Sequence, residues 1–308
     1  MLQRVLSPVL VGRQEELFQL EDALLSANRG DGRVVLLAGE AGIGKTRLAT
    51  ELTRRARKLG CAALWGSCSE VELSLPYLPF VEAIGNHLSE RDPAAVRADL
   101  GPMAAELSQL FPQLGEGLPA THAGDAGQAK LRLFESVVRL VELWARDRGL
   151  LLVLDDLHWA DSSTRELLDY AARRLPQSRV MLLATYRSDE LDRRHPLTRT
   201  AQVWRRAGLA ETVAVGAMSP AQVTEMISAI LDAEEVSGEL AALVPLVRRG
   251  TRSSRRCSGR RSSSSRASIT PSGPTGSPLR YRPPPAESSS GSSRVSRASA
   301  RASGRRPR

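Results

Sequence analysis

The chain has 308 residues and a formal net charge of +9, and its length suits one large domain or two small ones. Residues 250–308 hold 14 arginines and a single acidic residue, Glu287, so this segment carries +13 and the first 249 residues carry −4. The basic charge therefore gives no support for a nucleic-acid interface on the body of the protein, and we expect no direct DNA contact from it.

The two parts also differ in composition. Residues 1–249 are apolar throughout and long enough to form one substantial core. In residues 250–308, 18 of the 59 residues are serine and few are large and apolar, which favours a disordered tail. We therefore expect a folded domain over 1–249 and a disordered tail over 250–308.

The sequence favours a cytoplasmic protein without a membrane partner. Its three cysteines, Cys61, Cys68 and Cys257, form neither an even set nor a zinc-binding spacing. The longest apolar run, residues 149–154, is far shorter than the ~20 residues that span a bilayer. The first residues are interrupted by Pro8 and do not resemble a signal peptide.

Expected strands and helices alternate along the chain. Short, continuous apolar runs indicate buried parallel strands, and apolar residues at helical spacing indicate helices. Strands are predicted over 33–38, 61–66, 150–154, 179–185 and 211–215, and helices over 45–59, 76–88, 94–110, 128–148, 163–175, 196–207 and 219–231, with a loop over 112–127. This alternation predicts an α/β fold, a doubly wound and mostly parallel sheet with helices on its faces.

Two helix starts carry capping signals. The segment Ser163-Thr164-Arg165-Glu166 reads as a capping box. Ser219 is followed by proline at the first helical position and by Gln222, which predicts a reciprocally capped helix there.

The segment Gly-Glu-Ala-Gly-Ile-Gly-Lys-Thr, which ends at Thr46, matches the P-loop pattern between an expected strand and an expected helix. Gly39, Gly42 and Gly44 let backbone N–H groups turn toward bound phosphates. Lys45 is expected to reach the β- and γ-phosphates, and Thr46 to ligate Mg²⁺. A glycine-rich turn with an incidental Lys-Thr pair is the alternative, but the chain has only three lysines. The sequence predicts ATP or ADP, with Mg²⁺, as the ligand.

An acidic pair follows the expected strand 150–154. Asp155 is expected to hold the metal together with Thr46, and Asp156 to polarise the attacking water. For Asp156 the alternative is a solvated loop carboxylate. Asp161 is expected to cap the following helix.

A cationic side chain follows the expected strand 179–185. Because ligands of open α/β sheets bind at the carboxyl ends of the strands, Arg187 is expected to contact the γ-phosphate and to distinguish ATP from ADP. The alternative is an ion pair between Arg187 and Asp189 or Glu190.

Four motifs occur in order along residues 9–249. They are Val11-Gly12-Arg13, the P-loop, the segment 154–161 (Leu-Asp-Asp-Leu-His-Trp-Ala-Asp) and the segment 184–190 (Ala-Thr-Tyr-Arg-Ser-Asp-Glu). Together they closely resemble the signal-transduction ATPases with numerous domains (STAND), which are P-loop NTPases with an AAA-type, origin-recognition-like ATPase domain. The nearest likeness is to the ATPase module of large LuxR-type transcriptional regulators and of related bacterial adenylate cyclases.

The resemblance implies an ATP-driven switch in which ADP holds a closed form, exchange for ATP opens it, and slow hydrolysis resets it. It also implies self-association in the ATP state. On this basis Val11, Gly12 and Arg13 would line the adenine side. The residues around the phosphates would be Lys45, Thr46, Asp155, Asp156 and Arg187.

The resemblance stops near Arg249. Such proteins continue with a Gly-Asn-Pro-Phe-Phe-like stretch and then with winged-helix, helical-repeat and DNA-binding domains, and we recognise none of these in residues 250–308. A legal set of codons for residues 249–258, read in a shifted frame, encodes Gly-Asn-Pro-Phe-Phe-Ala-Glu-Val-Leu. We therefore interpret the tail as a frameshifted sequence, which the coding DNA would test.

Three interpretations of function remain open at this stage. The first is an ATP-binding, slowly hydrolysing switch module that lacks its effector and DNA-binding domains. The second is a non-functional remnant without regulated ATPase activity. The third is an ATPase whose arginine-rich arm binds nucleic acid through nonspecific phosphate contacts.

Overall fold

The computed structural model describes residues 10–70, 75–115, 125–192 and 195–231. The chain divides into two units, Met1–Arg255 and Arg256–Arg308. The expected disordered tail, 250–308, lies outside the described residues, and so does the end of the expected domain from 232 to 249.

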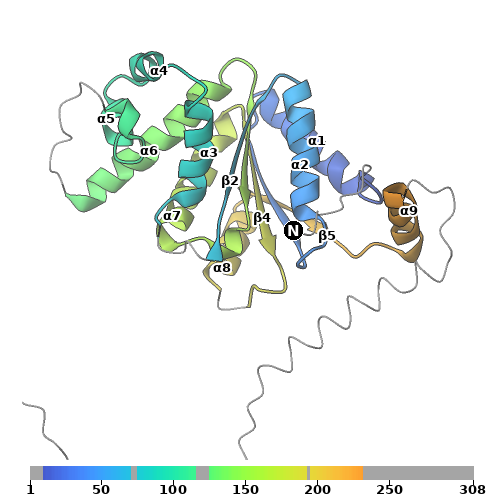
Figure 1. Ribbon diagram of the computed structural model, residues 1–308. Coiled ribbons are helices and arrows are strands. Elements are labelled where there is room, and N and C mark those ends of the chain that lie inside the picture. Colours follow the sequence, from blue (N-terminus) through green and yellow to red (C-terminus); the bar gives the residue numbers. More distant parts are fainter. Residues whose placement is uncertain (1–9, 71–74, 116–124, 193–194, 232–308) are drawn as a thin grey trace, which may run out of the picture. The chain divides into compact units, whose positions relative to one another are not determined.

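A five-stranded sheet forms the centre of the first unit (Figure 1). Its strands are β1 (Arg33–Gly39), β2 (Ala62–Ser67), β3 (Leu150–Asp155), β4 (Val180–Arg187) and β5 (Glu211–Val215). They lie in the order β2-β3-β4-β1-β5, and each neighbouring pair is parallel. The predicted α/β fold with a parallel sheet is confirmed.

Helices cover both faces of the sheet. One face carries α1 (Gln14–Asn28) and α2 (Lys45–Lys58), and the helices of the other face stand opposite them in Figure 1. The remaining helices are α3 (Leu78–Leu88), α4 (Pro93–Leu100), α5 (Met103–Leu107), α6 (Ala126–Ala145), α7 (Ser162–Arg174), α8 (Pro196–Arg206) and α9 (Pro220–Leu231), with 3-10 turns η2 (Pro112–Leu114), η3 (Leu157–Trp159) and η4 (Leu175–Gln177).

Apolar residues follow one another without interruption along the strands because the sheet is buried on both faces. Successive side chains of a strand point to opposite faces. On β1, Val34 and Leu36 join the cluster beneath α3, α6 and α7, whereas Val35 and Leu37 join the cluster beneath α1 and α2. The side chains that point to either face must therefore be apolar, as expected for a parallel sheet covered on both faces.

Three features differ from the sequence-based expectations. Helix α1 was not predicted. The expected helix 94–110 is two helices, because Gly101 takes a positive φ of 59° and Pro102 follows it. The predicted capping box at Ser163 is wrong, since the N-cap of α7 is Asp161, whose carboxylate accepts from the N–H groups of Ser163 and Thr164. The expected capping role of Asp161 is thereby confirmed.

The strand order brings the P-loop beside the acidic pair. From β1 the chain crosses to the far edge at β2 and returns through β3 to β4, which lies next to β1. The carboxyl ends of β1, β3 and β4 therefore meet at one edge of the sheet, the lower edge in Figure 1. Ligands of open α/β sheets bind at such a reversal of strand order.

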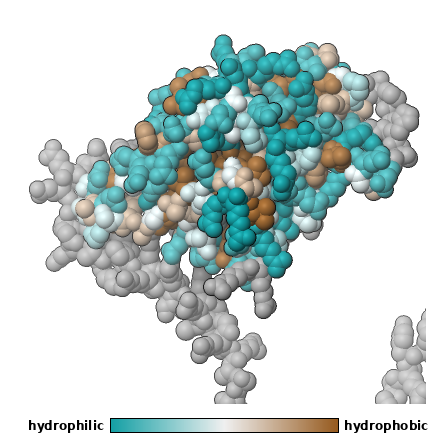
Figure 2. All heavy atoms as spheres, turned by 180° about the vertical axis from the view of Figure 1, so that it is seen from behind, coloured by the Kyte–Doolittle hydropathy of each residue, from teal (hydrophilic) through white to brown (hydrophobic). Residues whose placement is uncertain are grey.

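The face of the molecule drawn in Figure 2 is mainly polar. Figure 2 shows hydrophilic side chains over most of the face seen there, with apolar residues in small groups between them. Among the helices that the structure describes, none is long and apolar enough to cross a lipid bilayer.

Candidate functional site

The P-loop is a turn that requires glycine. Gly42 and Gly44 have φ values of +70° and +108°, and open space surrounds the position where each would carry a Cβ. At Gly39 a Cβ would lie 2.8 Å from the Ile43 side chain and 3.0 Å from the carbonyl oxygen of Val215. The loop is therefore an open concave turn that leads into the amino end of α2, where unpaired N–H groups and the helix dipole favour anions.

Lys45, the first residue of α2, folds back over the P-loop. Its ammonium group donates to the carbonyl oxygens of Gly39 at 3.0 Å and Glu40 at 2.9 Å, and the residue is buried. Burial lowers the pKa of Lys45, while the carboxylate of Asp156 opposes this. The lysine is thus held at the mouth of the loop by two carbonyl groups that a phosphate oxygen can replace.

A hydroxyl and a carboxylate suited to Mg²⁺ meet beside the P-loop. Oγ1 of Thr46 donates to Oδ2 of Asp155 at 3.1 Å, and Asp155 is buried at the end of β3. Hard oxygen donors of this kind are the ligands that Mg²⁺ prefers. The residues predicted to bind the metal therefore lie together, and their chemistry fits the ion.

Thr185, on β4, holds the acidic pair in place. Its hydroxyl donates to Oδ1 of Asp155 and accepts from the backbone N–H of Asp156 at 3.0 Å. Thr185 has no exposed surface. This residue was not singled out from the sequence. The available signal, a hydroxyl within an apolar strand, is shared with threonines that merely pack.

Asp156 adopts a strained backbone conformation. Its φ is +57°, in the left-handed region that non-glycine residues rarely occupy. This turn directs the carboxylate toward two neighbours, with Oδ1 at 3.8 Å from Nε of Arg187 and at 3.7 Å from Nδ1 of His158. Strain of this kind gathers at functional sites.

Arg187 is paired with Glu190. Its guanidinium donates to Oε1 of Glu190 at 2.6 Å, and this contact raises the pKa of Arg187. One of the two partners considered from the sequence is therefore present. The same carboxylate has its other oxygen 3.3 Å from Nε2 of His158, so Asp156, His158, Glu190 and Arg187 form a closed ring of neighbours.

The imidazole of His158, one of the four members of this ring, is only 2% exposed. Burial lowers its pKa to about 4, although the carboxylate of Glu190 acts in the opposite direction. Neither ring nitrogen has a hydrogen-bond partner among the described residues. The histidine is therefore neutral near pH 7.

A further carboxylate touches the P-loop itself. Oδ1 of Asp189 accepts from the backbone N–H of Ala41 at 3.2 Å. Asp189 also acts on the ammonium group of Lys45 through its charge. A negative group thus occupies one of the backbone donors that the loop offers to phosphate.

The N-terminal motif is packed against the P-loop. Arg13 is buried and donates to the carbonyl oxygens of Ile43 at 3.2 Å and Gly216 at 2.7 Å, and it pairs with Glu16. Val11 is buried as well. The side chain of Gln222, on α9, lies over Gly12 so closely that a Cβ there would meet it at 2.5 Å. Arg13 therefore contacts the P-loop directly, and a role of the three motif residues toward adenine stays a prediction.

A comparison with protein families decides the classification. Residues 9–183 match the family described as AAA ATPase domain, which is more than half of the chain. The chain belongs to the AAA ATPase domain family. This match covers the P-loop, the acidic pair and the first half of β4.

Similar individual proteins share only part of their length with this AAA ATPase domain. An uncharacterized protein of Rhizobium meliloti (strain 1021) is 30% identical over 210 residues, which are 61% of this chain and 20% of that protein. The chain thus spans about a fifth of its curated relative.

Solved structures show partial similarity. The Aeropyrum pernix ORC1 protein in complex with DNA is 20% identical with a TM-score of 0.41, over 75% of this chain and 52% of that one. A Thermotoga maritima RuvB variant is 20% identical with a TM-score of 0.39, over 75% and 55%. DnaA from Aquifex aeolicus, bound to AMPPCP, is 15% identical with a TM-score of 0.39, over 76% and 55%.

Proposed function

We propose that this AAA ATPase domain binds ATP and ADP with Mg²⁺ at its P-loop and hydrolyses ATP slowly. The observation that carries the proposal is the meeting of Lys45, Thr46 and Asp155 at the carboxyl edge of the sheet. An ammonium group, a hydroxyl and a buried carboxylate beside a glycine-rich turn are the groups that P-loop enzymes use to hold a triphosphate and its metal.

Each side chain has a distinct task in this proposal. The ammonium group of Lys45 leaves its two carbonyl partners for oxygens of the β- and γ-phosphates. Thr46 and Asp155 hold Mg²⁺, which neutralises phosphate charge when bound. Asp156 orients a water molecule toward the γ-phosphate and accepts its proton. Arg187 exchanges Glu190 for the γ-phosphate and thereby reports which nucleotide is present. Val11, Gly12 and Arg13 form the adenine side.

Equilibrium binding of a fluorescent ATP analogue, with and without Mg²⁺, tests the proposal. The wild-type protein should bind, and Mg²⁺ should strengthen binding. Lys45→Ala should weaken binding by at least tenfold, and circular dichroism should show that this variant folds. Lys58→Ala, at the other end of α2, is the matched control and should bind as the wild type does. Equal, weak binding by the wild type and Lys45→Ala would exclude a nucleotide site here.

The resemblance to STAND ATPases supports a finer proposal, in which this domain is the cytoplasmic switch module of a LuxR-type transcriptional regulator. In that role ADP holds the closed form, ATP opens it and favours self-association, and hydrolysis resets it. Limited proteolysis in ADP and in a non-hydrolysable ATP analogue tests the switch. Different cleavage patterns would support it, and identical patterns at saturating nucleotide would contradict it.

A further inference from the structure

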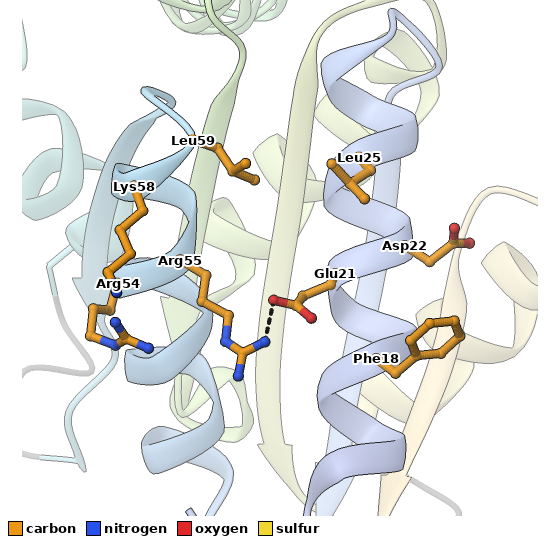
Figure 3. A pocket seen from close by; sticks show the side chains of 8 residues that line it. All are labelled: Phe18, Glu21, Asp22, Leu25, Arg54, Arg55, Lys58 and Leu59. Carbon is orange, nitrogen blue, oxygen red and sulfur yellow. Dashed lines mark hydrogen bonds and ion pairs between the residues drawn. The ribbon is translucent and has the colours of Figure 1, made fainter.

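A groove lies between helices α1 and α2 at the surface of the domain (Figure 3). In Figure 1 these two helices stand on the side of the sheet opposite α3 and α6. The groove has a volume of about 470 Å³. Three of its lining residues are apolar and exposed, namely Phe18 at 71%, Leu25 at 41% and Leu59 at 51%. None of them belongs to the core or to the P-loop site, so the folding of the domain and the proposed nucleotide site leave their exposure unexplained.

The charges of the groove are divided between its two walls. Helix α1 contributes the carboxylates of Glu21 and Asp22, and α2 contributes the cations of Arg54, Arg55 and Lys58. Both arginines already pair with Glu51 of their own helix. Glu21 and Arg55 pair across the groove at 2.5 Å. Within the described part of the chain, Asp22 and Lys58 form no ion pair, and both are exposed.

Figure 3 shows how these residues are arranged. Both helices run in the same direction, because Phe18 and Arg54 lie toward one end of the groove and Leu25 and Leu59 toward the other. Asp22 points away from the groove on the outer side of α1, and Lys58 lies on the outer side of α2. The two unpaired charges are therefore on opposite flanks of one face.

We propose that this face, formed by α1 and α2, binds a second copy of the chain around a two-fold axis that runs parallel to both helices. Such an axis places α1 of each copy over α2 of the other. Lys58 then faces the partner's Asp22, Leu59 faces the partner's Leu25, and the guanidinium of Arg54 faces the ring of the partner's Phe18. Each of these contacts occurs twice, as in any two-fold interface, and a cation over an aromatic ring is favourable.

The division of charge selects this arrangement over others. An axis perpendicular to the helices would place the acidic α1 over the partner's α1, where like charges repel. A second copy is the occupant that offers each wall the opposite sign.

The size of the face predicts a weak dimer. The helices have 15 and 14 residues, and at 1.5 Å per residue each is about 22 Å long. A face two helices wide buries less than the roughly 800 Å² per partner of a standard interface. Association should therefore depend on concentration and weaken with salt, because solvent-exposed charges contribute to it.

Sedimentation velocity of the full chain over about 1–100 µM tests the proposal. At low salt the wild type should shift from monomer to dimer across this range. Phe18→Glu should abolish the shift, whereas Leu131→Glu, which alters another exposed apolar residue (53% exposed), should leave it unchanged. A wild type that stays monomeric throughout, or a Phe18→Glu variant that dimerises as the wild type does, would overturn the proposal.

A charge exchange tests the pairing itself. Asp22→Lys and Lys58→Asp should each weaken dimerisation by about tenfold, since each introduces two repulsive pairs, and the double exchange should restore it. Failure of the double variant to recover would exclude the parallel axis. This dimer is proposed to form without nucleotide, so Lys45→Ala should dimerise as the wild type does when no nucleotide is present. Association that appears only with ATP would overturn this dimer and would belong to the switch proposed above.

Discussion

The hydroxyl of Thr185, on β4, is shared between the two aspartates that end β3, because it donates to the carboxylate of Asp155 and accepts from the N–H of Asp156. One buried oxygen atom thereby links the residue proposed to bind the metal to the residue proposed to orient water. The left-handed turn at Asp156 depends on the same contact, since no other described residue bonds to that N–H.

Replacement of Thr185 by valine should damage both the fold and the site. Valine keeps the shape but removes the hydroxyl, which leaves a buried carboxylate oxygen and a buried N–H without their partner. Such a loss costs about 1–3 kcal/mol of unfolding free energy. Urea denaturation measures this cost, and Thr185→Ser, which retains the hydroxyl, should lie closer to the wild type. Mg²⁺-dependent ATP binding should fall in the valine variant and persist in the serine variant.

Removal of the negative charge at Asp189 should strengthen nucleotide binding. Its carboxylate occupies the N–H of Ala41 and lies near the position expected for the terminal phosphates. Asp189→Asn keeps an acceptor oxygen but removes the repulsion of phosphate, so affinity should rise by about fivefold, and more for ATP than for ADP.

Asp147→Asn is the matched control for this change. It alters the net charge equally, but Asp147 precedes β3 and therefore lies at the opposite edge of the sheet. The nucleotide affinity of Asp147→Asn should equal that of the wild type. An unchanged or weaker affinity in Asp189→Asn would show that the carboxylate does not oppose the nucleotide.

His158 should make the domain sensitive to mild acid. Burial lowers the pKa of His158 from 6.5 to about 4, so the unfolded chain binds this proton more readily than the folded one. The neutral His158 therefore adds up to about 3 kcal/mol to the free energy of unfolding. This contribution is fully present above about pH 6.5 and is lost as the pH falls toward 4. The groups that face the ring are Asp156, Arg187, Glu190, Lys45 and His195.

His158→Asn separates this effect from the titration of carboxylates. Asparagine stays neutral at every pH, so its unfolding free energy should decline less steeply than that of the wild type between pH 6.5 and pH 4. Urea denaturation at several pH values measures the unfolding free energy of both proteins. An equal dependence of this free energy on pH in the two proteins would contradict a buried neutral histidine.

Gly66 should not tolerate a side chain. A Cβ at this position would lie 1.8 Å from the carbonyl oxygen of Pro79, so β2 and the start of α3 would have to separate. We expect Gly66→Ala to lose about 1–3 kcal/mol of stability. At Gly216 nothing lies within 4 Å of an added Cβ, and Gly216→Ala should unfold at nearly the wild-type temperature. Thermal unfolding of the two variants compares them directly.

The strands could be predicted because burial on both faces leaves an unambiguous pattern. Each of the five apolar runs is a strand, and the P-loop lies between a strand and a helix as its pattern requires. Helix α1 escaped prediction because its apolar residues do not form one stripe. Leu17, Leu20 and Leu24 face the core, but Phe18 and Leu25 are exposed. These two exposed apolar residues obscure the helical spacing of the others.

Side-chain partners were harder to predict than elements. Four residues in a row from Asp161 to Thr164 are suitable N-caps, so both Asp161 and Ser163 were predicted to cap the same helix, and the geometry shows that Asp161 does. The acidic pair could be placed from its position after a strand. Thr185 could not, because a threonine within an apolar strand is equally typical of a β-branched residue that merely packs.

Arg13 is bonded to a residue 203 positions further along the chain, Gly216, and the same guanidinium nitrogen holds the carbonyl oxygen of Ile43 in the P-loop. Helix α9 begins four residues after Gly216. Any force that draws α9 away from the sheet therefore pulls on the main chain of the P-loop through a single side chain. Arg13 therefore couples any movement of α9 mechanically to the shape of the P-loop, the loop proposed to hold phosphate.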